Sequence, residues 1–260
     1  MVQRASQPPA DFVNDQQRDQ QSDQSPDQQE NPNDILNAVR WLARRTVFLL
    51  LLMAALFVSA GRSDWPGAWI FVGIYAISTA ITGLILIPNN MDLIHERNRG
   101  GDNIKPWDRW LAPLMALLMP LALWVAAGLE VRFSGTVPAA SPICAAGVVL
   151  GIAAQAIGIW ALAANPFFSG VVRIQHERGH RTIQRGPYGG LRHPAYAAYV
   201  LYAIATALLL QSTWAAVLAV PLIGVTILRT ALEDRTLRAE LPGYAAYADR
   251  VRFRLLPGIW

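Results

Sequence analysis

The stretch GPYGGLRHPAY, residues 186–196, places Arg192 and His193 directly before Pro194, where an apolar run begins. Proline suits the first turn of a helix, where its missing N–H is not needed, and the residue before it is pushed toward extended geometry. We therefore expect Arg192 and His193 at the N-terminus of a helix that begins near Pro194. That end of a helix carries partial positive charge and free N–H groups, which suit an anionic group of a ligand.

Three tyrosines follow at three-residue spacing and form one stripe along this helix: Tyr196, Tyr199 and Tyr202. The plain alternative is a membrane interface, in which arginine binds lipid phosphates and tyrosine belongs to the aromatic belt. The combination of GPY with RHPxY is harder to explain in that way, so we interpret it as part of a binding site.

A second polar stretch, VTILRTALEDR, ends another apolar run. Arg229 and Glu233 are four residues apart and share a helix face. Arginine in front of glutamate is the weaker orientation for a helix-stabilising pair, so local helix support explains little of the pattern. The alternative is a solvated helix end. We predict that Arg229, Glu233 and the neighbouring Asp234 face a site.

Residues 176–180 read HERGH and match the letters of the zinc motif HExxH. That motif needs a helix, which would bring His176 and His180 onto one face. Gly179 disfavours a helix here, and no third ligand is evident. We therefore expect no metal site.

The composition indicates an integral membrane protein. Hydrophobic residues make up 53% of the chain and charged residues only 15%, against about 25% in an average soluble protein. Several apolar windows approach 20 residues, the length that a helix needs to cross a bilayer. The net charge of +4 comes from arginines between these windows and not from one soluble patch, so we exclude nucleic acid as a partner. The single cysteine, Cys144, excludes an intramolecular disulfide.

The predicted fold is an all-α integral membrane fold with about six transmembrane helices and a C-terminal helical hairpin. Residues 1–34 are polar and should be disordered, and residues 35–45 should form an interfacial amphipathic helix. Residues 46–164 hold the N-terminal transmembrane helices, and residues 165–260 hold the remaining two and the cofactor pocket. The expected spans are 46–61, 66–87, 111–129, 142–164, 195–210 and 213–230. Pro113 and Pro120 are expected kinks in the third span.

Charge placement predicts the orientation. Lysine and arginine concentrate in residues 97–109, 173–192 and 229–254, whereas the alternate loops hold only Arg62 and Arg132. Basic residues favour the cytoplasmic side, so both termini and the long polar loops should be cytoplasmic.

The last two spans are joined by only Gln211 and Ser212 and should form a tight antiparallel hairpin. The start of the fifth span and the end of the sixth then lie side by side. This arrangement should bring Arg229, Glu233 and Asp234 close to Arg192 and His193 in one cytoplasmic pocket.

These motifs resemble the isoprenylcysteine carboxyl methyltransferase family, a group of membrane enzymes related to phospholipid N-methyltransferases. The family pattern is GPY-x-x-x-RHPxY, a hydrophobic hairpin, R-x-x-x-E-E, a later Y-x-x-Y and a basic end, and all parts occur here in order. NPFFSGVVRIQHERGH and MDLIHER with WDR are also similar to bacterial members. The likeness covers roughly residues 85–260. One departure is Asp234, which stands where the pattern has a second glutamate.

The resemblance implies S-adenosylmethionine as cofactor and assigns roles to matched positions. Its cofactor-binding residues would be Pro187, Tyr188, Arg192, His193, Pro194, Tyr196, Glu233 and Asp234. Arg229 and Glu233 would act in catalysis by completing the pocket or positioning the substrate. The shorter side chain of Asp234 puts the role of that second carboxylate in doubt. The resemblance explains HERGH as part of a loop near the cofactor.

The cofactor's groups match the residue types. Basic groups and a helix N-terminus suit its carboxylate, a glutamate suits its ammonium or ribose, and tyrosine rings suit its adenine or sulfonium. The acceptor should be a small lipophilic carboxylate, thiol or lipid amine in a bacterial inner membrane. A carboxylate acceptor needs no general base, whereas an amine or thiol would need Glu233 or His193 as one.

Two other functions stay open at this stage. Membrane sterol-type reductases share a related C-terminal architecture and would use NADPH, which should require more clustered basic residues. A non-catalytic transporter or scaffold would normally show polar or broken helices near mid-bilayer. Gln155 is the main polar residue in mid-span, and a single amide there is more often a contact between helices. The sequence leaves the oligomeric state open.

Overall fold

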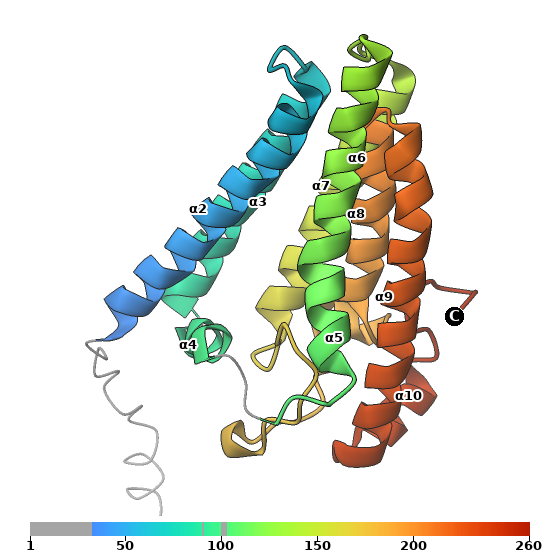
Figure 1. Ribbon diagram of the computed structural model, residues 1–260. Helices are drawn as coiled ribbons and strands as arrows, with labels where there is room; N and C mark the ends of the chain where they lie inside the picture. Colours follow the sequence, from blue (N-terminus) through green and yellow to red (C-terminus); the bar gives the residue numbers. More distant parts are fainter. Residues whose placement is uncertain (1–32, 90, 100–102) are drawn as a thin grey trace, which may run out of the picture. The chain divides into compact units, whose positions relative to one another are not determined.

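The fold is all-helical, as the sequence predicts. The computed structural model describes residues 33–89, 91–99 and 103–260. Every secondary-structure element within these residues is a helix (Figure 1). The chain divides into two compact units, residues 1–36 and residues 37–260. The polar tail expected over residues 1–34 lies almost entirely outside the described residues.

Five helical segments are long and apolar enough to cross a membrane: α2 (Asn33–Ala60), α3 (Pro66–Asn89), the segment Asp108–Ser134, α7 (Pro142–Ala164) and α9 (Thr213–Glu240). The sixth expected crossing is α8 (Pro194–Leu210), which is apolar but has only 17 residues. At 1.5 Å per residue such a helix is about 26 Å long, at the lower end of what spans a bilayer. The chain is therefore an integral, multi-pass membrane protein.

Helix α2 combines two segments that the sequence analysis treats separately. The interfacial helix expected over residues 35–45 and the span expected over residues 46–61 form one continuous helix. Residues 33–60 contain neither proline nor glycine, so nothing in them interrupts the backbone hydrogen bonds. The helix ends at Ala60, and the next residue, Gly61, has a positive φ of 69°, a conformation that glycine adopts readily.

The third span contains the irregularity that its prolines predict. Helix α5 (Asp108–Pro113) and helix α6 (Met119–Ser134) are joined by a π-helical turn, η1 (Leu114–Leu118). In this turn the N–H of Met119 donates to the carbonyl of Leu114, five residues earlier. The next position, Pro120, has no N–H to offer Met115. The hydroxyl of Tyr199 in α8 donates to the Met115 carbonyl instead, which ties the break to the tyrosine stripe.

Helices α7 and α8 make the most extensive helix–helix contact in the described chain. Small residues allow this approach, since an ideal Cβ on Gly147 would lie 2.3 Å from the backbone nitrogen of Leu209. Close packing of small residues is how helices associate in lipid, where no hydrophobic effect drives them together. Helix α8 also contacts α3, α6 and α9, so it is largely surrounded by protein.

The predicted C-terminal hairpin is confirmed. Helix α8 ends at Leu210 and α9 begins at Thr213, so Gln211 and Ser212 alone form the turn. Gln211 has the left-handed φ of 51°, and the Ser212 side chain accepts the N–H of Ala215 at 3.0 Å. Because the turn is so short, the start of α8 lies beside the end of α9.

The long polar connections lie at the same end of the helices, the lower end in Figure 1. They include α4 (Met91–Arg99), the loop of residues 165–193 and α10 (Tyr244–Arg250). Lys105, in the connection after α4, joins the loop of residues 165–193 to the end of α9, since its N–H donates to the Val172 carbonyl at 3.0 Å and its Nζ pairs with Glu240 at 2.6 Å. A site at this end can therefore use residues from distant parts of the sequence.

The contact at Gly147 yields a test of the fold. We expect Gly147→Ala to destabilise the protein by about 1–3 kcal/mol, because the added methyl would overlap the Leu209 backbone. Gly151→Ala is the matched control, since its Cβ would meet only ordinary contacts at 3.8–3.9 Å. Thermal unfolding in detergent checks this prediction. Equal unfolding midpoints for the two variants would contradict the close approach of α7 and α8.

Candidate functional site

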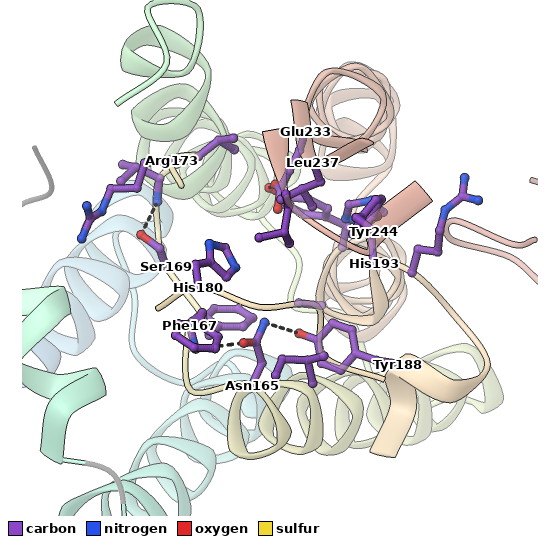
Figure 2. A pocket seen from close by; sticks show the side chains of 18 of the residues that line it. Asn165, Phe167, Ser169, Arg173, His180, Tyr188, His193, Glu233, Leu237 and Tyr244 are labelled. Carbon is purple, nitrogen blue, oxygen red and sulfur yellow. Dashed lines mark hydrogen bonds between the residues drawn. The ribbon is translucent and has the colours of Figure 1, made fainter. Parts of the chain in front are cut away.

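A cavity of about 300 Å³ lies where the hairpin meets the polar loops (Figure 2). This volume is at the lower end of the range typical for small-molecule sites. Its walls come from the loop after α7, the starts of η3 (Gly186–Gly189) and α8, the end of α9, and α10. In Figure 2, Asn165, Phe167 and Tyr188 lie on one side, and Glu233 and Leu237 lie across from them.

The structure brings most of the predicted site residues together. Those that line the cavity are Tyr188, Arg192, His193, Tyr196, Arg229 and Glu233. Those that do not line it are Pro187, Pro194 and Asp234. The two prolines are buried; Pro187 is the second residue of the short helix η3 and Pro194 is the first residue of α8, so both shape the backbone next to the cavity. The expected convergence of the start of α8 with the end of α9 is thus what the structure shows.

Tyr196 connects the two helices of the hairpin inside the cavity. Its hydroxyl donates to the Glu233 carboxylate at 2.5 Å. Its ring lies 5.5 Å from the guanidinium carbon of Arg229 and 5.8 Å from the His193 ring. One tyrosine therefore contacts three of the other predicted site residues.

Arg229 shares a helix face with Glu233, but its carboxylate partner in the structure is Asp108. It forms a bidentate ion pair with Asp108 of α5, at 2.7 and 2.9 Å, and also donates to the Gly170 carbonyl at 2.8 Å. Asp108 is fully buried, and its second oxygen accepts the N–H of Val172 at 2.6 Å. The pair thereby joins α9, α5 and the loop after α7. Asp108 belongs to the WDR stretch, but the sequence offers no sign that it pairs with Arg229.

Asp234 lies behind the cavity wall. It is only 1% exposed, and its carboxylate accepts hydrogen bonds from Tyr244 at 3.0 Å and Arg254 at 3.0 Å. It also bonds Arg192 at 3.2 Å and lies 3.3 Å from His193 Nε2. Asp234, the second carboxylate of the motif, does not line the cavity. It instead contacts Arg192, His193 and Tyr244, which do. This position explains how an aspartate can replace the longer glutamate of the family pattern.

The loop after α7 forms one wall of the cavity. The sequence analysis places this loop near the cofactor but assigns no site residue to it. It contributes Asn165, Phe167 and His180 to the cavity, and α10 contributes Tyr244 and Tyr247. The two tyrosines are the Y-x-x-Y of the sequence motif, which assigns them no individual role. The loop itself is braced at Arg173, a buried side chain that pairs with Glu96 of α4 at 2.5 Å and with Glu177 at 2.7 Å.

The HERGH stretch does not form the helix that a zinc motif requires. Residues His176–Arg178 make a single 3₁₀ turn, and Gly179 then takes a left-handed φ of 62°. The two histidines consequently separate. The His176 side chain is exposed, whereas the His180 ring packs on Phe167 with centroids 4.7 Å apart and its Nδ1 lies 3.4 Å from the N–H of Gln175.

Four ionisable groups of the cavity wall outside the spans, three tyrosines and one histidine, are held in their neutral forms. Burial raises the pKa of the Tyr188 and Tyr244 hydroxyls well above their usual range, and raises that of Tyr247 to about 12. These hydroxyls stay protonated at neutral pH and act as donors. Burial, together with Arg178 and Arg173, lowers the pKa of His180 to about 4. Its imidazole is therefore uncharged at neutral pH.

One family model matches the chain. Residues 146–239, from α7 to the end of α9, match the model of the isoprenylcysteine carboxyl methyltransferase (ICMT) family. This region contains the loop after α7, the starts of η3 and α8, and the end of α9, which together supply most of the cavity wall. A search of curated proteins found no match to the chain.

The neutral state of His180 predicts a dependence of stability on pH. In the unfolded chain the pKa of His180 is about 6.5. Between that pH and about pH 4 the unfolded state therefore binds a proton that the folded state does not bind. We expect the free energy of unfolding to fall between about pH 6.5 and pH 4. His180→Gln should reduce this fall, whereas His176→Gln, which changes an exposed ring, should leave it in place. Denaturant unfolding at several pH values measures the slope, and equal slopes in all three proteins would contradict the prediction.

Proposed function

We propose that this chain, whose residues 146–239 match the isoprenylcysteine carboxyl methyltransferase family, is a membrane methyltransferase that moves a methyl group from S-adenosylmethionine to a lipophilic acceptor. The observation that carries the proposal is the convergence on one cavity of the residues that the family motif singles out. Tyr196, Arg229 and Glu233 come from both helices of the hairpin and contact or approach one another there.

The chemistry of the cavity wall suits this cofactor. S-adenosylmethionine, when bound, supplies a methyl group already activated by a sulfonium. The carboxylate of Glu233 suits the ammonium or the ribose hydroxyls, and the rings of Tyr188 and Phe167 suit adenine or a cationic centre. What the protein must then provide is alignment of the two reactants and exclusion of water. The ion pairs of Arg229 with Asp108 and of Asp234 with Arg192 hold the two arginines in place in the cavity wall.

The cavity also reaches into the membrane-spanning part of the protein. Met115 and Ala116 of the third span and Tyr199 of α8 line it, together with residues of the polar loops. This supports an arrangement in which a hydrophilic cofactor enters from the aqueous side and an apolar acceptor enters from the bilayer. We propose a small lipophilic carboxylate, thiol or lipid amine as acceptor. His193 and Glu233 both line the cavity and would serve as the base for an amine or thiol.

The charge distribution favours this function over an NADPH-dependent reductase. Three of the arginines that line the cavity already have carboxylate partners: Arg173 with Glu96, Arg192 with Asp234, and Arg229 with Asp108. A phosphate-rich cofactor would have to compete with these pairs. The polar wall at one end of the helices is also unlike a transport path through mid-bilayer.

The arrangement in the cell is part of the proposal. The polar loops lie at one end of the helices (Figure 1), and their sequences carry most of the basic residues of the chain. We therefore propose that this end and both termini face the cytoplasm of a bacterial inner membrane. We further propose that residues 165–260 form the methyltransferase region. The transmembrane residues 46–164 would support it and supply the acceptor side of the cavity.

Cofactor binding tests the proposal directly. The purified protein in detergent should bind S-adenosylmethionine and its demethylated product, and should not bind NADPH. We expect Glu233→Gln and His193→Ala each to weaken this binding about tenfold or more, because each loses a polar contact in the cavity. Glu240→Gln is the matched control, since Glu240 lies on the same helix but pairs with Lys105 at the surface. Calorimetry measures the affinities. Wild-type affinity for S-adenosylmethionine in both cavity variants would contradict the assignment of the site. Binding of NADPH would contradict the proposed methyltransferase function.

The acceptor can be identified by its chemistry. With a labelled methyl donor and membrane lipid extracts, we expect the label to enter an organic-soluble product. Mild alkali should release the label from an ester and leave it on an amine or a thioether. Label that stays entirely in water-soluble products would contradict a lipophilic acceptor.

A further inference from the structure

Asp108 of α5 influences the charge of the cavity wall, although it does not line the cavity. Its side chain is fully buried and forms the bidentate ion pair with Arg229 at 2.7 and 2.9 Å. Arg229 does line the cavity. Its positive charge is therefore neutralised by a carboxylate that a ligand in the cavity does not meet.

This pairing leaves the Glu233 carboxylate without a cationic partner. Glu233 lies one helical turn from Arg229 on α9, where an ion pair between the two would be possible. Within the described residues, however, Glu233 forms no ion pair, and its carboxylate accepts only the Tyr196 hydroxyl. Asp108, Arg229 and Glu233 together hold two carboxylates and one guanidinium, so this group carries one net negative charge.

The other basic groups of the wall do not cancel this charge. Those next to a buried carboxylate are Arg173 with Glu96, and Arg192 and His193 with Asp234. Arg181 is exposed, so water and salt screen its charge. The three tyrosines and the one histidine that burial keeps neutral add no charge. Glu233 is thus the carboxylate of the described cavity wall that faces a ligand without a counter-ion.

An unpaired carboxylate in a cavity sheltered from water favours a ligand with a net positive charge, because charges interact over several ångströms at low dielectric. S-adenosylmethionine carries a carboxylate, an ammonium and a sulfonium, and so has one net positive charge. In methyl transfer the bond between sulfur and the methyl carbon breaks with its electron pair on sulfur, and the carbon bonds to the acceptor. The demethylated product therefore has no net charge but keeps every hydrogen-bonding group of the cofactor.

We propose that Asp108 is a positioning residue for methyl transfer: by holding Arg229 it leaves the Glu233 charge unpaired, and this charge selects the sulfonium cofactor over its neutral product. The inference rests on the methyltransferase function proposed above. It gives the buried pair a part in turnover, since the product loses the attraction that favours binding of the cofactor and is released more readily.

The affinities of three ligands for the purified protein in neutral detergent test this proposal. S-adenosylmethionine and sinefungin are both cationic, because sinefungin has a carbon bearing an ammonium in place of the methylated sulfur. S-adenosylhomocysteine, the demethylated product, is neutral. Calorimetry should show that both cationic ligands bind about tenfold more tightly than the product. Equal affinities for all three would overturn the proposal and leave the methyltransferase function standing, whereas binding of none would overturn both.

Asp108→Asn tests whether the preference depends on the buried ion pair. The substitution keeps the size of the side chain but removes its charge, so Arg229 becomes the counter-ion of Glu233. The tenfold preference for the cationic ligands should then fall to about one. A purely structural role of Asp108 would weaken all three ligands equally and keep the preference, and that result would overturn the role proposed for Asp108.

Two further variants complete the test. Glu96→Gln is the matched control, since it neutralises another buried carboxylate and Arg173 keeps Glu177 as a second partner. This variant should keep the preference for the cationic ligands. Glu233→Gln removes the unpaired charge without touching the buried pair, so it decides the case even where Asp108→Asn does not fold. It should abolish the preference, and a preference that persists in Glu233→Gln would overturn the proposal.

Discussion

Buried carboxylates in an apolar protein must be compensated, and this requirement organises the functional end of the molecule. Asp234 and Asp108 are 1% and 0% exposed, and each is held by an arginine and by further donors. Such pairs add little to stability on average, because the cost of desolvation offsets their attraction. What they provide here is position. Each joins segments that are far apart in the sequence, and breaking one would leave an uncompensated charge in the protein interior.

The two pairs stand behind different parts of the same cavity. Asp234 binds Arg192, Tyr244 and Arg254, so the start of α8, α10 and the C-terminal tail are fixed to α9. Asp108 binds Arg229 and the N–H of Val172, so the loop after α7 is fixed to α9 and α5. The Glu233 carboxylate between them faces the cavity, with Tyr196 as its donor. Adjacent carboxylates on one helix therefore have separate tasks, one structural and one directed at the ligand.

The hairpin makes this division possible. A two-residue turn leaves α8 and α9 no freedom to slide, so residues 193–199 and residues 229–237 stay opposite each other. The close packing of α7 on α8 through Gly147 and the contact of Tyr199 with the π-helical turn fix α8 against the other helices. Alignment of two reactants demands this rigidity, because small displacements of reacting groups slow a reaction markedly.

The sequence by itself determined the membrane class, the helix positions, the hairpin and those cavity-lining residues that belong to its motifs, among them His193, Tyr196 and Glu233. These features follow from local patterns: apolar length, prolines at helix starts, a two-residue connection, and motifs in which neighbours in sequence share one face. Only the tertiary structure decided that Asp234 lies buried behind the cavity wall and that Arg229 pairs with Asp108. The partner of a buried charge depends on which distant segment packs against it. Neither residue type nor spacing along one helix contains that information.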